Sequence, residues 1–321
     1  MTIGGGAAET VTVAAVQAAP VFLDRDATVQ KACRLVDEAA AHGARLVVFP
    51  ETFVPPYPDW VWRLKPWELR AGALAARLLD QAVVAGDEST DRLAGAARSN
   101  GCYVSIGVNE RESQGSTLYD TQLCFGPDGA IAARHRKLAL TGAERLVWGV
   151  GDGSGLAVVD TPFGRLGGLT GWENYMPLAR SALLAQAPDV YLAPTWDSSD
   201  VWISTLRHMA KEGRVFVVGV NSCIRGSDVA PDVPFRNDIY GDGDDWLAVG
   251  NSAIVGPEGE VLAGPLAKAE GILYAHVDAE QARESRHQFD PFGHDARPDV
   301  LRLLVDFGSR MPVTFAGSRP E

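Results

Sequence analysis

The chain has 321 residues, 46% hydrophobic and 22% charged, which is the composition of a folded globular protein rather than a disordered one. Its formal net charge of −12 disfavours a nucleic-acid-binding protein, because an extended phosphate-binding face needs clustered Lys and Arg. Met1–Thr10 lacks the basic and apolar regions of a secretory signal, and no apolar run approaches the roughly 20 residues that span a bilayer, so we expect a cytoplasmic protein.

Short apolar runs alternate with helical patterns from the beginning of the chain. Val11–Gln17 predicts a buried strand. Gly43 is placed to end a helix whose apolar face consists of Val29, Cys33, Val36 and Ala40. Further strands are predicted at Leu46–Phe49, Tyr103–Val108, Leu118–Phe125 and, after the turn Pro127-Asp128-Gly129, Ala130–Arg134.

The alternation continues in the second half. Helices are predicted at Pro177–Gln186 and at about Val201–Glu212. A second hairpin is predicted at the turn Pro257-Glu258-Gly259. Strands are predicted at Leu166–Thr170, Val190–Ala193, Val215–Val220, Ser252–Val255 and Ile272–Val277. Strands alternating with helices, together with hairpins, indicate an α/β domain with a mixed sheet or sheets.

The sequence gives no sign of a second domain or of a metal site. No linker rich in Pro or Ser divides the chain, so we expect one domain. The Gly- and Asp-rich stretch Asp238–Asp245 is expected to be a solvated loop, because its spacing does not match an EF-hand. The four scattered cysteines are expected to be buried, reduced thiols: Cys33, Cys102, Cys124 and Cys223. We therefore expect neither a metal nor another cofactor.

Charged residues that follow predicted strands are candidates for catalysis. Glu51 comes directly after a buried strand, where apolar surroundings raise the pKa of a carboxyl group toward that of a general base. Lys137 follows another strand, and Glu144 comes seven residues later. Taken singly, each is an ordinary loop or surface charge. Their ordered occurrence before the sequence Gly-Trp-Glu-Asn at 171–174 is what makes them notable.

This ordered set resembles the nitrilase branch of the carbon–nitrogen hydrolase superfamily, over nearly the whole chain. The most specific motifs are Phe49-Pro50-Glu51-Thr52-Phe53, His135-Arg136-Lys137-Leu138, Ala143-Glu144-Arg145 with Trp148-Gly149, and Trp172-Glu173-Asn174-Tyr175-Met176-Pro177. The resemblance implies a single-domain, four-layer α-β-β-α sandwich. It implies a carbon–nitrogen hydrolase domain over residues 1–286 and a tail over 287–321 that packs at an oligomer interface. The implied partners are a small nitrile and further copies of the chain, as a homodimer or larger spiral, and neither nucleic acid nor membrane.

The resemblance also implies a mechanism and a role for each site residue. A cysteine of the family attacks the nitrile carbon to form a thioimidate, and two water molecules then release ammonia and the carboxylic acid. The general base corresponds to Glu51, the stabilising cation to Lys137, and the orienting carboxylate to Glu144. The expected oxyanion and substrate contacts are Trp172, Glu173, Tyr57, Trp60 and Trp196.

The nucleophile is the one position at which this chain departs from the family pattern. A cysteine is expected directly before Trp172, and this chain has Gly171, which has no side chain. We therefore expect an inactive form of a nitrilase-type hydrolase, with Gly171 a deliberate substitution in an otherwise complete site. Two alternatives stay open: a non-catalytic, oligomeric ligand-binding relative, and an amidase or cyanide-converting member of the superfamily.

Overall fold

The computed structural model describes residues 9–113, 115–241 and 243–309. Residues 1–8 of the predicted domain and residues 310–321 of the predicted tail therefore lie outside the described residues. Within these ranges the strands form one six-stranded and one seven-stranded sheet. Both sheets are mixed, as the sequence predicts.

The first sheet has the strand order β13-β1-β2-β3-β4-β5. Its centre is parallel, since β1 pairs with β2 and β2 with β3 in that sense, whereas β13, β4 and β5 join antiparallel. Its strands are β1 (Val11–Gln17), β2 (Ala44–Val48), β3 (Tyr103–Arg111), β4 (Leu118–Phe125), β5 (Ile131–Arg136) and β13 (Gly271–Val277).

The second sheet has the order β10-β11-β9-β8-β7-β6, and β12 pairs with β11. Here β7, β8 and β9 are parallel, and the outer pairs are antiparallel. Its strands are β6 (Val159–Thr161), β7 (Gly164–Gly168), β8 (Val190–Thr195), β9 (Phe216–Asn221), β10 (Cys223–Arg225), β11 (Trp246–Val255) and β12 (Val261–Ala267). Hairpins at both predicted Pro-x-Gly turns are confirmed.

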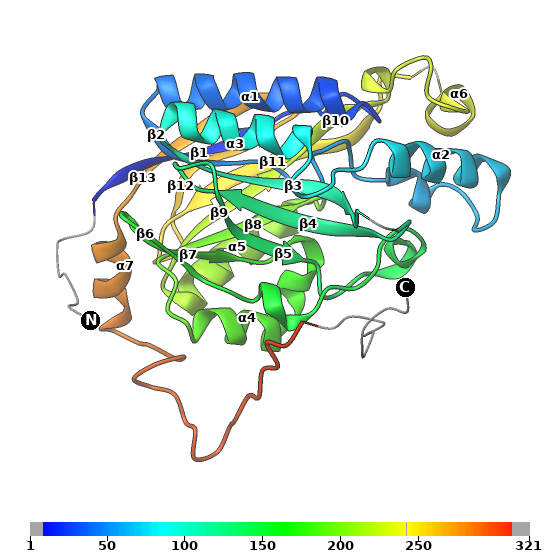
Figure 1. The fold of residues 1–321 in the computed structure, drawn as a ribbon. Coiled ribbons are helices and arrows are strands. Elements are labelled where there is room, and N and C mark those ends of the chain that lie inside the picture. Colours follow the sequence, from blue (N-terminus) through cyan, green and yellow to red (C-terminus); the bar gives the residue numbers. More distant parts are fainter. Residues whose placement is uncertain (1–8, 114, 242, 310–321) are drawn as a thin grey trace, which may run out of the picture.

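Helices cover the outer faces of both sheets (Figure 1). Helices α1 (Arg25–Ala41) and α3 (Glu88–Asn100) lie on the first sheet, and α4 (Pro177–Leu184) and α5 (Asp200–Gly213) lie on the second. The other helices are α2 (Leu69–Asp80), α6 (Arg236–Tyr240) and α7 (Ala279–Arg286), with 3₁₀ turns η1 (Asp59–Trp62), η2 (Gly142–Leu146), η3 (Gly153–Gly155), η4 (Gly171–Tyr175) and η5 (Gly226–Asp228). The predicted four-layer α-β-β-α sandwich is confirmed.

The layers follow from the alternation of side chains along each strand. In β1, Ala14 and Val16 pack in the cluster with α1 and α3, whereas Val13 and Ala15 pack between the two sheets. Successive strand residues point to opposite faces, so a strand with consecutive apolar residues must be covered on both sides. In β8 the same division separates Val190 and Leu192 from Tyr191 and Ala193.

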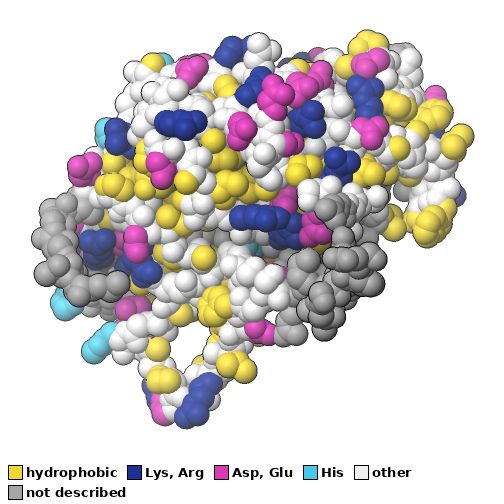
Figure 2. Space-filling model, viewed as in Figure 1, with side chains coloured by type: hydrophobic (Ala, Val, Ile, Leu, Met, Phe, Trp, Pro, Cys, Tyr) yellow, Lys and Arg dark blue, Asp and Glu magenta, His cyan; other side chains and the backbone are white. Residues whose placement is uncertain are grey.

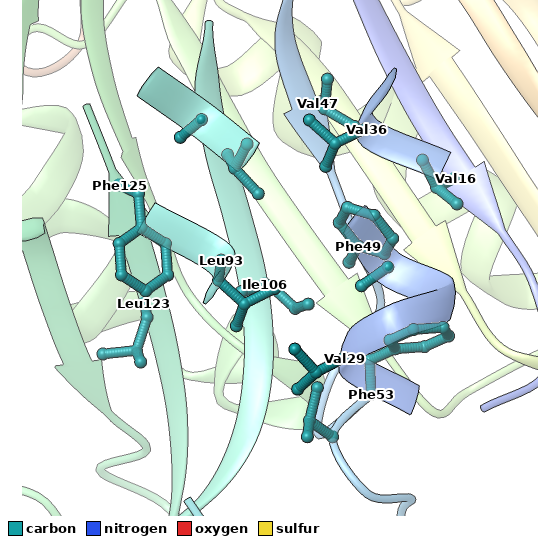
Figure 3. Packing of buried hydrophobic residues seen from close by; sticks show 14 of the residues in the cluster. Val16, Val29, Val36, Val47, Phe49, Phe53, Leu93, Ile106, Leu123 and Phe125 are labelled. Atoms are coloured by element: carbon teal, nitrogen blue, oxygen red, sulfur yellow. The ribbon is translucent and has the colours of Figure 1, made fainter. Parts of the chain in front are cut away.

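Figure 3 shows the layer between the first sheet and its helices. Val29 and Val36 of α1 and Leu93 of α3 lie against strand residues such as Ile106, and all are fully buried. Each such side chain contributes about 1.5–3 kcal/mol through removal from water. The expected end of α1 is confirmed, because His42 is its C-cap and Gly43 follows.

Several elements were not predicted. Helices α2 and α3 fall in a stretch to which the sequence assigned no structure, because each buries only a narrow apolar stripe, such as Leu74 and Leu78 in α2. The prediction of a loop over Asp238–Asp245 is wrong in part, because residues 238–240 belong to helix α6. After α7, residues 287–309 form no helix or strand.

The surface and the thiols are those of an ordinary globular protein. Figure 2 shows basic and acidic side chains interspersed over the layer of α1 and α3, without a continuous basic patch on that face. All four cysteines are free, three of them buried and Cys33 half-buried. Across the described ranges, no helix combines the length and apolarity that crossing a membrane requires.

Leu93→Ala tests the helix–sheet packing. We expect it to lower the free energy of unfolding by about 2–5 kcal/mol, because it leaves a cavity between α3 and the sheet. The matched control is Leu69→Ala, which removes the same atoms from a side chain that is 81% exposed and should cost less than about 0.5 kcal/mol. Urea denaturation measures both variants, and equal losses would contradict the packing described.

Candidate active site

Glu51 lies in a tight turn directly after β2. The turn is held against β3, where Gly107 N donates to Pro50 O at 3.1 Å and Val54 N donates to Gly107 O at 3.0 Å. A Cβ atom on Gly107 would overlap the backbone of Pro50 and Thr52. Glycine at 107 therefore lets β3 approach closely enough to fix Glu51 at the end of the sheet.

Lys137 follows β5, and its backbone N–H donates to Asp120 O at 2.8 Å. Its side chain is only 1% exposed, and its Nζ contacts three carboxyl groups. The distances are 2.6 Å to Glu51 Oε1, 2.9 Å to Glu144 Oε1 and 3.3 Å to Asp120 Oδ2. The structure thus brings the predicted residues Glu51, Lys137 and Glu144 together, with Asp120 as an additional neighbour.

Glu144 lies in η2 as part of a capping box. One oxygen, Oε2, accepts from Thr141 N at 2.8 Å and from Thr141 Oγ1 at 2.9 Å. The other, Oε1, accepts from Tyr57 OH at 2.8 Å and from Lys137 Nζ. Both carboxylate oxygens are thereby fixed.

The pKa values in this cluster follow from burial and from the ion pairs. Burial raises the pKa of Glu51, although the Lys137 ammonium opposes the rise. Burial also disfavours the charge on Lys137, but the carboxyl groups of Glu51, Asp120 and Glu144 outweigh it and raise the pKa of Lys137 well above its ordinary value. For Glu144, burial is outweighed by Lys137 and by the hydrogen bonds from Thr141 and Tyr57, which lower its pKa.

Gly171 begins η4, shortly after β7, with a φ of +56°. A Cβ atom at this position would point directly at the cluster, 2.9 Å from Lys137 Nζ and in overlap with the Glu51 carboxylate. Any side chain at 171 would therefore emerge between the acid and the ammonium. The left-handed backbone conformation favours glycine over other residues by about 1–2 kcal/mol.

The motif that follows Gly171 holds this turn in place. Glu173 Oε1 accepts from Thr170 N at 2.7 Å and contacts His135 Nε2 at 2.6 Å, and its Oε2 accepts from Leu138 N at 2.8 Å. Asn174 Nδ2 donates to Gly171 O at 2.9 Å. The turn is thus tied both to itself and to the segment that carries Lys137.

An open cleft of about 610 Å³ leads to the carboxylate–lysine cluster and has aromatic walls. Its volume is in the range of small-molecule sites. Tyr57 and Trp196 stack with ring centroids 4.6 Å apart and planes 6° apart, and Trp196 N donates to Glu51 Oε2 at 2.6 Å. Trp172, half-exposed, lines the same cleft and donates from Nε1 to Asp197 at 2.9 Å.

Two residues expected at the substrate lie elsewhere. Glu173 is fully buried and turned toward His135, so its role here is to hold the turn. Trp60 is buried against Phe22, on another face of η1 from Trp62. Trp62 lines the cleft instead and donates to Tyr57 OH at 3.2 Å.

Asp120 and Trp62 were missed. An Asp inside a strand is costly when it is buried, and this was the available signal for Asp120. For Trp62 the signal was weak, because Trp60 and Trp62 face different directions in the 3₁₀ turn and the sequence does not say which one faces the cleft.

In the part of the chain that the structure describes, no group of three His, Cys, Asp or Glu side chains is arranged to hold a metal ion. Two acidic side chains of the cleft, Glu51 and Glu144, contact the Lys137 ammonium instead.

Comparison with known proteins gives consistent matches. Residues 12–287 match the carbon-nitrogen hydrolase family. The chain is 44% identical to an aliphatic nitrilase from Sinorhizobium fredii (strain HH103), over 91% of this chain and 94% of the relative. It is 40% identical to nitrilase 2 from Arabidopsis thaliana, over 97% and 93% of the two chains. It is 39% identical to the bifunctional nitrilase/nitrile hydratase NIT4B from Nicotiana tabacum, over 96% and 90%.

Solved structures support the same fold at lower identity. A carbon-nitrogen hydrolase from Helicobacter pylori G27 superposes with a TM-score of 0.71 and 21% identity, over 91% of this chain and 96% of the other. Saccharomyces cerevisiae Nit3, a member of branch 10 of the nitrilase superfamily, gives 0.69 and 21%, over 88% and 95%.

His135→Gln tests the support of the turn at Gly171. Although burial opposes it, Glu173 raises the pKa of His135 above 6.5, and His135 with two backbone N–H groups lowers the pKa of Glu173 below 4.5. The charge pair therefore stabilises the fold fully between these two values. Its contribution is lost as pH rises through the folded-state pKa of His135, or falls through that of Glu173. We expect the variant to lose about 1–3 kcal/mol at pH 4.5–6.5 and less at higher pH.

Chemical denaturation across pH measures this loss. His208→Gln is the control, because its side chain is 65% exposed beside Glu212, so its loss should cost far less stability than the loss of buried His135. A loss at His135 that stays constant from acidic to alkaline pH would exclude the charge pair.

Proposed function

Because the chain belongs to the carbon-nitrogen hydrolase family, within its nitrilase branch, we propose that its site is built to hydrolyse a nitrile to a carboxylic acid and ammonia. The observation that carries the proposal is the direction of the Cα–Cβ bond at 171. A thiol there would lie between Glu51 and Lys137, a base and a cation. This is the arrangement that nucleophilic attack on a weakly electrophilic carbon requires.

We assign the steps to residues as follows. Glu51 takes the proton of a thiol at 171 while the sulfur adds to the nitrile carbon, and the nitrile nitrogen gains a proton to give a thioimidate. Water then adds at the same carbon and ammonia leaves, which gives a thioester. A second water, activated by Glu51, replaces the sulfur and releases the acid. Lys137 and the backbone N–H of Trp172 stabilise the developing negative charge, and Glu144 holds Lys137.

As given, the chain has no nucleophile at 171, and we propose that it is an inactive form of this hydrolase. Loss of a covalent nucleophile costs on the order of 10⁶ in rate in another hydrolase class. The proposal that Gly171 replaces a cysteine in a working sequence rests on the neighbours: Glu51, Lys137 and Glu144 keep the contacts that the chemistry needs. A non-catalytic ligand-binding protein is the second candidate, supported by Gly171 itself.

The substrate class follows from the cleft and from the relatives. Stacked Tyr57 and Trp196, with Trp62 and Trp172, offer apolar walls to an organic nitrile. Relatives are named aliphatic nitrilase and bifunctional nitrilase/nitrile hydratase, so an amide is a possible second product. Amidase or cyanide-converting activity would be detected as turnover of amides or cyanide by the Gly171→Cys variant.

We also propose that the chain self-associates through the outer helices of the second sheet. Leu178 of α4 and Val201 of α5 are both about two-thirds exposed, next to half-exposed Tyr175 and Met176. Exposed apolar side chains gathered on one face favour burial against another copy. A further contact through the tail after α7 remains an expectation.

Gly171→Cys should restore hydrolysis. We expect release of ammonia and acid from a panel of aliphatic and aromatic nitriles, at a rate about 10⁶ above that of the chain as given. The substitution should cost about 1–2 kcal/mol of stability, because cysteine must adopt the left-handed conformation and displace the Glu51 carboxylate.

Gly171→Ala is the matched control. It adds the same Cβ and should cost similar stability, but it should release no ammonia. A folded Gly171→Cys protein that is inactive on every nitrile, while the unaltered chain binds acids or amides by calorimetry, would favour the ligand-binding candidate.

Val201→Asp should disrupt the proposed association. A charge buried in an apolar interface is strongly unfavourable, so we expect the variant to sediment as a smaller species than the unaltered chain. Val150→Asp is the control, since Val150 is equally exposed but lies outside α4 and α5. An unchanged sedimentation coefficient for Val201→Asp would exclude this face as the interface.

A further inference from the structure

Asp120 is a third carboxyl group at the centre of the site, beyond the two glutamates assigned above. It lies in the middle of β4, between Asn109 of β3 and the residues that lead to Lys137. Its side chain is 1% exposed. The ionisable groups that face it are Lys137, at 3.3 Å, and the carboxyl groups of Glu51 and Glu144.

The three carboxyl groups differ in the hydrogen bonds that they accept. Glu144 accepts from Thr141, Tyr57 and Lys137, and Glu51 accepts from Trp196 N and Lys137. Neither side-chain oxygen of Asp120 accepts a hydrogen bond from the described residues. A buried carboxylate is stable only where donors replace the lost water, so Asp120 is the least supported of the three as an anion.

The net charge of Lys137 and its three carboxyl neighbours also indicates that Asp120 is protonated. Three carboxylates around one ammonium would leave a net charge of −2 in a site from which water is largely excluded. One proton shared with the cluster reduces this to −1. The group with the fewest donors is the one that takes the proton. Glu51 Oε1 and Asp120 Oδ2 lie 2.6 and 3.3 Å from the same Lys137 Nζ, so as an acid Asp120 can donate to Glu51.

We propose that Asp120 is a neutral carboxylic acid in the folded protein and a positioning residue, which donates a hydrogen bond to Glu51 and keeps Glu51 ionised beside Lys137. Consistent with this, burial and the neighbouring Glu51 and Glu144 carboxylates raise the pKa of Asp120 well above its ordinary value, against the effect of Lys137. Burial raises the pKa of Glu51, and the Lys137 ammonium together with a hydrogen bond from Asp120 opposes that rise.

The consequence for chemistry rests on the proposed hydrolase function. Glu51 can act as a base at neutral pH only in its ionised form, and burial alone favours the protonated form. A neutral donor at 120 supplies the hydrogen bond without adding repulsion. Asn at 120 would supply the same donor, whereas Ala would not.

The protonation state can be measured on the chain as it stands, without activity. We would label the aspartate side-chain carboxyl carbons with ¹³C and identify the Asp120 resonance by its loss in Asp120→Asn. We expect the shift of a protonated acid that does not titrate across the neutral range. A resonance with the shift of an ionised carboxylate at neutral pH would overturn the proposal.

The positioning role is measured in the Gly171→Cys background. Asp120→Asn should keep the acidic limb of the pH profile of kcat/KM within a few tenths of a pH unit. Asp120→Ala should move that limb upward by about one unit or more, with a loss of about tenfold or more at neutral pH. If both variants lose activity equally at every pH, with no shift of the limb, Asp120 has only a structural role and the positioning proposal fails.

These two measurements separate the proposals from each other. An inactive Gly171→Cys protein would count against the hydrolase function, and the carboxyl resonance would still decide whether Asp120 is neutral. If Asp120→Ala does not fold, the profile of Asp120→Asn decides: a shifted acidic limb would contradict the claim that an amide donor replaces the acid.

Discussion

The buried Lys137 ammonium and the carboxyl groups around it form the interaction on which the site depends. An ammonium group this deeply buried is unfavourable unless anions compensate it, and anions gathered this closely are unfavourable without a cation. Four separate segments deliver these groups: the turn after β2, the middle of β4, the end of β5 and η2. The two-sheet sandwich supplies a rigid frame on which such a cluster can be held, and position 171 completes it from the second sheet.

The turn at Gly171 is tied by hydrogen bonds to the segment that carries Lys137. Glu173 binds both Thr170 N and Leu138 N, so a single carboxylate connects the 171 turn to the residue after Lys137. The distance between residue 171 and the Lys137 ammonium is thereby controlled by the buried Glu173–His135 pair rather than by loop flexibility. Glu173 and Asn174 therefore hold the turn that contains residue 171, although neither side chain faces the cleft.

Much of this was predictable from sequence, and the failures have identifiable causes. Strands such as β1 and β8 carry consecutive apolar residues over most of their length, which predicts coverage on both faces. The four layers themselves came from the family resemblance. Glu51 and Lys137 could be placed because each comes soon after a predicted strand and both occur in order before Gly-Trp-Glu-Asn, as in the family that the chain resembles. Helices α2 and α3 escaped because their apolar stripes are narrow. Trp60, Trp62 and Asp120 depend on which way a side chain points within a 3₁₀ turn or a strand, and this is decided by tertiary packing.

The positive φ at 171 has a consequence for how such proteins change over generations. Replacing a reactive side chain there by hydrogen relieves strain, so the loss of chemistry is accompanied by a gain in folding stability. On the function and self-association proposed above, a subunit with glycine at 171 would occupy a place beside working copies in a mixed assembly and dilute turnover without any sign of misfolding.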